Sequence, residues 1–377
     1  MKHKRIYALL LSSLAIGMML GCNKSPTDSS TATTDARSVV SWPAADALFR
    51  SDPSWLGGDG AYSIDLGSGR VLWLFGDSFI ATSDKHVRSE SKMVRNSVAI
   101  QFGYDPSAAS IAFYWTVESE EPQSFFPEKG NLWFWPGHGI RLENTLLIFL
   151  MKTRSANRDL GFETVGWTAV SISNPDDAPD NWQLSWLDAP ANDYGVAVGS
   201  ASVLRIDDYL YAFSAEEPGV HDVYIVRWPV ERARQGDLSE PQWWTGEVAG
   251  WVAQHRLTRK PQVAFAGGQT EFTVHYEPAL GKFLEIQTDG FGSADLAMRT
   301  ADALTGPWSG LARFHRPDEY GISNILIYAG KSHPELVGAD NVLTYVANNL
   351  DFNKLVNDTT IYYPRFLKGT VIERRVR

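Results

Sequence analysis

Two aspartates near the start of the chain have the residue type and spacing needed for acid–base chemistry. Asp59 lies in a GGDG motif and Asp77 ends the apolar segment VLWLFGD (71–77). If the intervening GSG segment (67–69) is a hairpin turn, Asp59 faces Asp77 with Cβ atoms about 4.5–5.5 Å apart. Like charges at that separation raise one pKa, so the pair would hold one proton and one negative charge near neutral pH. Such a pair could supply the acid and the nucleophile or base of glycoside hydrolysis.

Two other interpretations of this pair remain open at the level of the residues. Asp59 can cap the tight GGDG turn while Asp77 bonds to its neighbouring loop, because aspartate is common at strand ends. Alternatively, the two carboxylates bind a cation. Residue types alone do not separate these readings from catalysis.

The two aspartates belong to the first of five similar strand pairs. Beyond residue 40 the chain has no long helical periodicity, and short apolar or alternating segments are separated by Gly, Asn, Asp and Pro. The first strands of the pairs are expected at 57–65, 136–142, 198–206, 270–278 and 331–338, and the second strands at 71–77, 145–151, 209–215, 282–288 and 342–348. Further strand-like segments follow most pairs. This repeat predicts an all-β fold, a five-bladed β-propeller, with a β-sandwich or jelly roll as the alternative.

Ring closure and convergence of the inner strands lead to two positional expectations. We expect segments 38–42 and 370–376 to share or flank the fifth blade, because a propeller protects its last sheet edge by joining its termini. The starts of the five inner strands should meet around one concave mouth that suits a small molecule or a glycan. The polar residues expected there are Asp59, His138, Ser200, Thr270 or Glu271, His333 and Glu335.

Aromatic and histidine residues near this mouth have more than one interpretation. Trp133 and Trp135 share one face of a strand, and either stacks on a sugar or packs between blades, with stacking favoured more for Trp135. Trp243 and Trp244 are expected to pack in an outer strand. The residues His138, His275 and His333 lack the spacing of metal ligands, so we expect hydrogen-bonding roles, no metal and no cofactor.

The first 38 residues predict export rather than part of the fold. Lys2, Lys4 and Arg5 precede an apolar stretch that ends in MLGC, which is similar to a lipobox with Cys22 as the lipidated residue. We expect a lipoprotein signal peptide over 1–21, a Ser/Thr-rich tether over 22–38, and the propeller over 39–377. An ordinary signal peptide or anchor is the alternative. The predicted location is the cell envelope, with membrane attachment through the lipid only.

Charge and cysteine content exclude two classes of protein. The 34 basic residues are outnumbered by 44 acidic ones, giving a net charge of −10, so nucleic acid is not an expected partner. Cys22 is the only cysteine, so the folded domain has no internal disulfide. We expect a monomer whose partner is a polysaccharide.

Several motifs resemble those of a known family. GGDGAYSID, LWLFGDSF and RNS (95–97), with TEFTVHYEP, KSHPEL (331–336) and LTYVANN (343–349), resemble exported bacterial five-bladed propellers long catalogued as a domain of unknown function. That family includes endo-acting hydrolases of D-arabinan and looks like a relative of the furanosidase and arabinanase propellers. The resemblance implies that Asp59 and Asp77 are the essential carboxylates. It also implies weaker, substrate-binding roles for Asn96, His138, His333 and Asn348. Their places near the expected mouth predict substrate-binding roles for Trp135 and Glu271 as well.

The functional prediction from sequence is therefore a glycoside hydrolase. It would act on a furanose-containing, arabinan-like polysaccharide, cut within the chain, and use Asp59 and Asp77. The alternative, from a different class, is a surface lipoprotein that binds a glycan without cleaving it. Only the enzyme requires the two carboxylates to lie close together.

Overall fold

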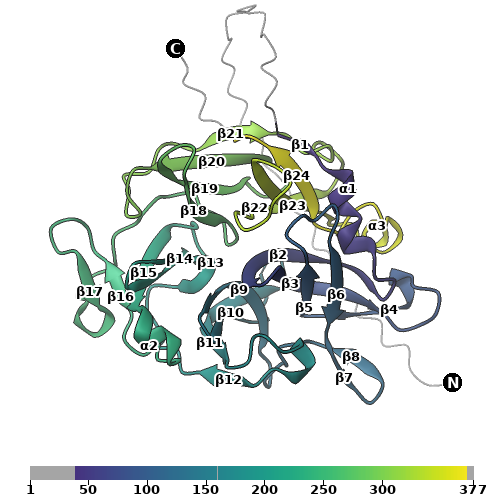
Figure 1. The fold of residues 1–377 in the computed structure, drawn as a ribbon, viewed down its shortest axis with the longest axis horizontal. Coiled ribbons are helices and arrows are strands. Elements are labelled where there is room, and N and C mark those ends of the chain that lie inside the picture. Colours follow the sequence, from purple (N-terminus) through teal and green to yellow (C-terminus); the bar gives the residue numbers. More distant parts are fainter. Residues whose placement is uncertain (1–38, 159, 372–377) are drawn as a thin grey trace, which may run out of the picture. The chain divides into compact units, whose positions relative to one another are not determined.

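The computed structural model describes residues 39–158 and 160–371, and these form the five-bladed β-propeller expected from the repeat. Figure 1 shows the five antiparallel sheets arranged around a central axis, in the order of the sequence. The predicted signal peptide, the whole of the tether with Cys22, and the last six residues lie outside the described residues. Expectations about those segments stay predictions.

Each blade is a short antiparallel sheet whose first strand lies nearest the axis. Blade 1 contains β2 (Trp55–Gly67), β3 (Arg70–Ala81), β4 (Ser91–Val94), β5 (Ser97–Phe102) and β6 (Ser110–Tyr114). Blade 2 contains β9 (Trp133–Leu142), β10 (Thr145–Ser155), β11 (Phe162–Ile172) and β12 (Leu184–Leu187). Blade 3 contains β13 (Val196–Ile206), β14 (Tyr209–Glu216), β15 (Val223–Pro229), β16 (Gln242–Trp244) and β17 (Trp251–Ala253).

The last two blades have four strands each. Blade 4 contains β18 (Thr273–Glu277), β19 (Lys282–Asp289), β20 (Asp295–Ala301) and β21 (Ala312–His315). Blade 5 contains β22 (Ile325–Ser332), β23 (Asn341–Asn349), β24 (Arg365–Gly369) and β1 (Val40–Ser41). A small separate hairpin is made by β7 (Thr116–Glu118) and β8 (Glu121–Gln123).

Blade 5 closes the ring with both ends of the described chain. β1 pairs antiparallel with β24, so that Val40 faces Lys368 and Ser41 faces Leu367. The N-terminal half of the closure prediction is therefore confirmed. On the C-terminal side, the strand that pairs with β1 is β24, which ends at Gly369. Thr370 and Val371 follow it and flank blade 5 through hydrogen bonds to Asp340 and Asn341, while residues 372–376 of the expected segment lie outside the described residues.

The inner strand of blade 5 also differs from the prediction. It is β22, at 325–332, whereas the sequence suggested 331–338. Residues 333–340 instead form the connection to β23, where Pro334 is unable to donate a backbone hydrogen bond to a sheet. Because this connection is long, the β22–β23 pair cannot be recognised in the sequence from a tight turn between two strands. As a result His333 and Glu335 lie after the inner strand and not at its start.

The hydrophobic core is divided among the five contacts between neighbouring blades. The cluster between blades 5 and 1 contains the buried side chains of Trp55, Trp73, Phe75 and Phe366. Four further clusters fill the other contacts between neighbouring blades, and a smaller sixth cluster adds to the contact between blades 5 and 1. Burying large aromatic side chains between sheets holds a propeller together, since truncating one typically costs about 3–5 kcal/mol. Trp243 is fully buried in β16, as its packing interpretation required.

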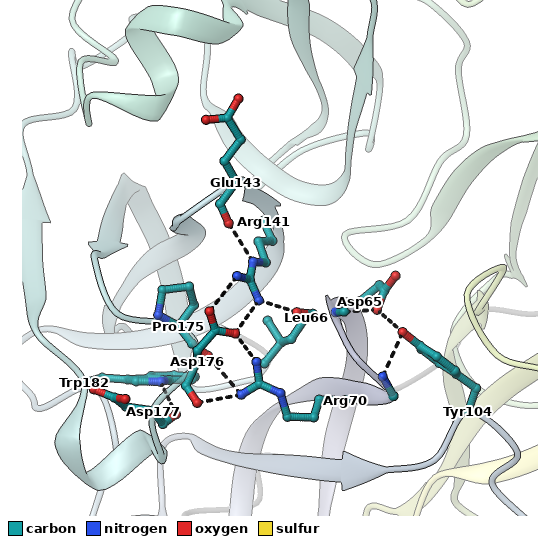
Figure 2. Close-up of polar contacts among 12 residues, drawn as sticks. Asp65, Leu66, Arg70, Tyr104, Arg141, Glu143, Pro175, Asp176, Asp177 and Trp182 are labelled. Carbon is teal, nitrogen blue, oxygen red and sulfur yellow. Dashed lines mark hydrogen bonds and ion pairs between the residues drawn. The ribbon is translucent and has the colours of Figure 1, made fainter.

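A polar cluster also joins blades 1 and 2, at the turn of the β2–β3 hairpin (Figure 2). The side chain of Arg141, in β9, donates 2.8 and 2.9 Å hydrogen bonds to the two carboxylate oxygens of Asp176. Arg70, in β3, pairs with the same carboxylate and donates a 2.8 Å bond to the Asp176 carbonyl. Arg141 also donates to the carbonyl of Leu66 in β2.

The described residues contain only short helices. These are α1 (Pro43–Asp46), α2 (Val230–Arg234) and α3 (Phe352–Asn357), with 3₁₀ turns at Leu48–Arg50, Arg88–Glu90, Pro179–Asn181 and Gln254–Arg256. In this part of the chain, no helix has the length and apolar character needed to cross a membrane. α3 begins after Asp351, whose side chain accepts hydrogen bonds from the amides of Asn353 and Lys354.

Candidate active site

The first hairpin places Asp59 and Asp77 beside each other. Its register confirms the expected pairing in the middle of the strands, with Tyr62 opposite Leu74. Nearer the strand starts the register shifts on both sides of Gly60, and Asp59 lies opposite Gly76 and Asp77. The mouth, defined as the end of the ring where β2, β9, β13 and β22 begin, therefore carries both carboxylates.

Gly76 allows the Asp59 carboxyl group to approach the neighbouring strand closely. A Cβ atom built on Gly76 would lie 2.4 Å from Oδ1 of Asp59, a distance that real Cβ atoms do not reach. The backbone at Gly76 is not in the left-handed region, so the requirement for glycine is one of space rather than conformation. The FGD motif thus supplies Asp77 and also the space beside Gly76 that the Asp59 carboxyl group fills.

Asp59 is held by phenols from blade 5. Tyr328, in β22, donates a 2.8 Å hydrogen bond to Oδ2 of Asp59 and accepts one from Asn348. The hydroxyl of Tyr362 lies 3.3 Å from the same oxygen and 3.0 Å from the carbonyl oxygen of Asp77. Burial, followed by the negative charges of Asp77 and Glu271, raises the pKa of Asp59 to about 8. This carboxyl group therefore keeps its proton at neutral pH.

Asp77 has donors of a different kind. Nη1 of Arg95 lies 3.1 Å from Oδ2 of Asp77 in an ion pair, and the indole of Trp135 donates a 2.8 Å hydrogen bond to Oδ1. Burial raises the pKa of Asp77, while the Arg95 charge and the Trp135 bond oppose that rise. Both contacts favour the ionised carboxylate. We therefore assign the proton of the pair to Asp59 and the negative charge to Asp77.

A buried lysine lies behind Asp59. Nζ of Lys331 donates a 3.0 Å hydrogen bond to Oε1 of Glu271 and a 2.7 Å bond to the carbonyl of Gly60. The Lys331 side chain is fully buried, whereas Glu271 is 19% exposed. The ammonium compensates one of the three carboxyl groups gathered at the mouth. Glu271, which was expected at the start of an inner strand, thus lies at the mouth between blades 4 and 5.

Aromatic side chains form part of the wall beside Asp77. Trp135 is half-buried and contacts the rings of Trp133 and Phe162 edge to face. The Arg95 guanidinium lies 4.4 Å from the centre of the Trp133 ring. Trp133 is buried and packs, whereas Trp135 reaches the mouth with its indole N–H occupied by Asp77. Phe291, which is 54% exposed, extends the wall on the other side, against Tyr328.

Three residues that the sequence assigned to the mouth lie deeper in the channel. His138 is the sixth residue of β9, and its ring bonds the carbonyl of Ser63 and the amide of Val203. His333 is buried between Ser63 and a threonine of β23. Ser200 is buried, with its hydroxyl bonded to a backbone amide. Counting from the predicted strand starts misplaced these residues, because β9, β13 and β22 begin earlier than expected.

These positions correct two substrate-binding predictions and argue against a third. Burial lowers the pKa of His138 to about 4 and that of His333 well below its ordinary value, so both rings are neutral. Asn96 is also fully buried, and its side chain bonds the backbone of Phe126 and the carbonyl of Phe134. His333 and Asn96 therefore support the fold. Both ring nitrogens of His138 are already bonded, which points to the same role.

The remaining predicted residues have mixed positions. Thr270, which precedes Glu271 in the sequence, donates a hydrogen bond from its hydroxyl to the carboxylate of Glu217. Asn348 acts on Asp59 only through Tyr328. Glu335 lies beyond the inner strand, with Oε1 buried and without a partner among the described residues, and burial raises its pKa to about 7. His275 is buried as well.

Sequence reasoning missed four functional side chains. Arg95 stood inside the quoted RNS motif, next to the residue that was selected, and its charge was the available signal. Tyr328 was hidden by the misassigned inner strand of blade 5. Lys331 began the quoted KSHPEL motif but was not selected. Tyr362 gave no local signal, because it reaches Asp59 and Asp77 from blade 5 across about 300 positions of sequence.

Within residues 39–158 and 160–371, no group of three His, Cys, Asp or Glu side chains is arranged to hold an ion. Arg95 and Lys331 already supply positive charge to Asp77 and Glu271. The arrangement instead offers one protonated and one ionised carboxyl group side by side, which can give a proton to a leaving oxygen and attack or activate water at the adjacent carbon.

Comparisons with known proteins support the fold. Residues 44–369 match the family model described as "Domain of unknown function (DUF5005)". Among solved structures, a Bacteroides ovatus ATCC 8483 protein provisionally titled a hydrolase aligns with a TM-score of 0.67 and 16% identity, over 89% of this chain and 92% of that one. At such identity the likeness shows the fold alone. A search of curated proteins finds no match.

Two further structures align less closely. The catalytic domain of the Coprinopsis cinerea GH62 α-L-arabinofuranosidase has a TM-score of 0.47 and 12% identity, covering 84% of this chain and 92% of that one. An exo-1,5-α-L-arabinanase from a bovine ruminal metagenomic library has a TM-score of 0.45 and 10% identity, covering 86% and 96%.

Proposed function

The chain belongs to the DUF5005 family, and we propose that it is a glycoside hydrolase in which Asp59 and Asp77 are the paired carboxylates. The observation that carries this proposal is the unequal environment of the pair. Asp59 is surrounded by phenols and other carboxyl groups, whereas Asp77 contacts a guanidinium and an indole N–H. Two carboxyl groups with separated proton affinities are what an acid and its partner require.

In this proposal Asp59 is the general acid. Its Oδ2 accepts from Tyr328, which leaves Oδ1, beside Gly76, to carry the proton. That proton passes to the glycosidic oxygen as the bond to the anomeric carbon breaks. The ionised carboxylate of Asp77 either attacks that carbon or takes a proton from the attacking water. Arg95 and Trp135 hold it in its charged form.

The substrate in this proposal is a furanose-containing, arabinan-like polysaccharide that is cut within its chain. The support for the sugar is the resemblance of the GGDG and FGD motifs to those of D-arabinan hydrolases. Trp135 and the exposed ring of Phe291 supply apolar surface on either side of the pair, against which sugar faces can pack. We further propose that the protein is exported and attached to a membrane through Cys22.

The proposal is tested by incubating the purified protein with arabinan, arabinogalactan and xylan and separating the products by chromatography. We expect a series of oligosaccharides from an arabinose-containing polymer. Asp59→Asn and Asp77→Asn should each lower turnover roughly 10²–10⁴-fold, the range of acid–base catalysis. Asp180→Asn, on an exposed turn of blade 2, is the matched control. Binding of a glycan without any products would favour the non-catalytic lipoprotein instead.

A further inference from the structure

A buried arginine joins the two chain segments that lead to the aspartate pair. Arg88 begins the 3₁₀ turn after β3 and is only 4% exposed. Its Nε donates a 2.7 Å hydrogen bond to the carbonyl of Leu56, three residues before Asp59. Its Nη2 donates a 2.7 Å bond to the carbonyl of Ile361, which directly precedes Tyr362. One guanidinium group therefore holds the backbone ahead of both residues.

The other nitrogen of this guanidinium binds the connection between β23 and β24. Nη1 of Arg88 donates bonds of 2.8 and 3.0 Å to the carbonyls of Leu355 and Asp358. All four of these bonds end on backbone carbonyls and none on a carboxylate. The planar guanidinium directs its N–H groups in fixed directions, which an ammonium cannot reproduce. The buried charge and the four carbonyls therefore constrain one another.

The connection between β23 and β24 needs such contacts because it is long. It runs over residues 350–364 and contains only one short helix, α3. Arg50 and Arg365 donate bonds of 2.8 and 2.6 Å to carbonyls of this connection from its exposed side. Arg88 holds it from the buried side, against β2. The position of its last residues therefore depends on arginine side chains rather than on a sheet or a long helix.

Tyr362, near the end of this connection, has an uncommon backbone conformation. Its φ is 62°, in the left-handed region that bulky residues rarely adopt, and the residue is 2% exposed. Such a conformation persists only where surrounding contacts fix it. The Tyr362 amide donates a 2.8 Å bond to the carbonyl of Ala347, and the Arg88 guanidinium lies 5.9 Å from the centre of its ring. These contacts set the direction in which the phenol points.

The first glycine of the GGDG motif fits against the same contacts. A Cβ atom built on Gly57 would lie 2.2 Å from the carbonyl oxygen of Tyr362 and 2.9 Å from Nη2 of Arg88. The φ of Gly57 is 120°, so both the space and the backbone conformation require glycine there. The strand that carries Asp59 is therefore packed directly on the backbone that carries Tyr362.

We propose that Arg88 is a positioning residue for the acid–base pair, and that it acts by holding the Tyr362 hydroxyl against Asp59 and Asp77. That hydroxyl lies 3.3 Å from Oδ2 of Asp59 and 3.0 Å from the carbonyl oxygen of Asp77. A displacement of about 1 Å at a reacting group can cost about a hundredfold in rate, so the placement of this phenol matters. The inference rests on the proposed function, because the role it assigns is in the reaction of the two aspartates.

The structural test is an NMR comparison of the wild-type protein with Arg88→Lys, which keeps the positive charge and loses the planar fork. Tyrosines are labelled with carbon-13 at the phenol carbon, and the Tyr362 signal is assigned with Tyr362→Phe. We expect this signal to move in Arg88→Lys toward that of a phenol in water, while the Tyr328 signal stays in place. Arg141→Lys removes an arginine fork at the other end of the β2–β3 hairpin and is the matched control, in which the Tyr362 signal should not move.

The kinetic test is the split between kcat and KM on the polymer that the protein cleaves. Arg88→Lys and Tyr362→Phe should each lower kcat about tenfold and change KM by less than about twofold, because both act on the aspartates and not on sugar binding. The double variant should lose no more than the larger single loss, since both changes act on one contact. Arg141→Lys should keep the wild-type kcat.

Several outcomes would overturn the role of Arg88. An unmoved Tyr362 signal in Arg88→Lys would do so, as would kcat losses that multiply to about a hundredfold in the double variant. An equal movement of the Tyr362 signal in Arg141→Lys would show general loosening and would also count against it. A moved signal in Arg88→Lys alone, in a protein that cleaves no polymer, would support the link to Tyr362 and overturn only the hydrolase function.

A reciprocal measurement decides the case in which Arg88→Lys does not fold. Exchange of the Arg88 Nε–H with water is then measured in wild type and in Tyr362→Phe, because a coupling between two residues acts in both directions. We expect exchange to be about tenfold faster in Tyr362→Phe. Equal exchange rates in the two proteins would overturn the proposal.

Discussion

The phenol of Tyr328 donates a 2.8 Å hydrogen bond to Oδ2 of Asp59, although 269 positions separate the two residues in the sequence. The bond joins the inner strand of blade 5 to that of blade 1, across the point where the ring closes. The same phenol accepts from Asn348 in the second strand of blade 5. The orientation of the Asp59 carboxyl group therefore depends on closure of the propeller.

Tyr328→Phe removes this bond while keeping the ring. Loss of the hydrogen bond, worth about 1.4 kcal/mol, should lower kcat about tenfold, with a smaller change in KM. The pKa of Asp59 should rise further, because the Tyr328 bond lowers it. Steady-state kinetics across pH, with Tyr320→Phe on an exposed part of blade 4 as the control, measure both effects. An unchanged kcat and pH profile would remove Tyr328 from the site.

The pH dependence of activity should be bell-shaped. Asp59 must be protonated to act as the acid, so activity should fall as pH rises through its pKa of about 8. Asp77 must be ionised, so activity should also fall at low pH, at a point above the ordinary pKa of an aspartate because burial raises the Asp77 pKa. Initial rates in constant-ionic-strength buffers give both limbs. A basic limb that persists in a stable Tyr328→Phe protein at the wild-type position would contradict the assignment of the acid.

The same group makes a prediction for stability. The pKa of Asp59 is higher in the folded protein than the ordinary value of 3.8, so its contribution is fully present below that value and is lost as pH rises through about 8. Asp59→Asn cannot ionise and should therefore become more stable than wild type as pH rises from 4 to 9. Thermal unfolding of the two proteins over this range measures the difference. A difference that does not grow with pH would show that Asp59 is not held protonated by the fold.

Gly76 offers a steric test of the carboxyl positions. Gly76→Ala would place a Cβ atom 2.4 Å from Oδ1 of Asp59, so the carboxyl group must move away. We expect a loss of activity of roughly tenfold or more with little change in the unfolding temperature. Gly310→Ala is the control, because a Cβ atom there meets nothing within 4 Å. Full activity in Gly76→Ala would mean that the position of Oδ1 does not matter for turnover.

The ion cluster of Figure 2 should contribute a small, pH-dependent stability. Hydrogen bonds from Arg141, then its charge and the bonds of Arg70, lower the pKa of Asp176, so its contribution is present above pH 3.8 and is lost below it. Because the Asp176 side chain is 61% exposed, Asp176→Ala should cost at most about 1 kcal/mol at neutral pH. Chemical denaturation at pH 7 and pH 3, beside Asp180→Ala, measures this. A cost that is as large at pH 3 would point to packing instead of charge.

Much of the architecture followed from sequence alone. Alternation of apolar residues and the recurring turns predicted five strand pairs and hence the propeller. The alternation has a period of two and each turn spans a few residues, so both signals can be read locally. The hairpin turn also predicted the pairing of Tyr62 with Leu74 and brought Asp59 beside Asp77. The inner strand of blade 5, β22, was the exception and was predicted at the wrong residues. Its connection to β23 through residues 333–340 is too long to be recognised as a hairpin turn.

Only the tertiary structure decided how the two aspartates differ. Tyr328, Tyr362 and Lys331 come from blade 5 and meet Asp59 because the ring closes, a contact between residues that no local period connects. The depth of His138 in the channel likewise depends on where β9 begins. Strand pairing is encoded over a few residues, whereas burial and charge at the mouth are set by all five blades together. The sequence therefore determined which carboxyl groups meet, and the fold decided which one keeps its proton.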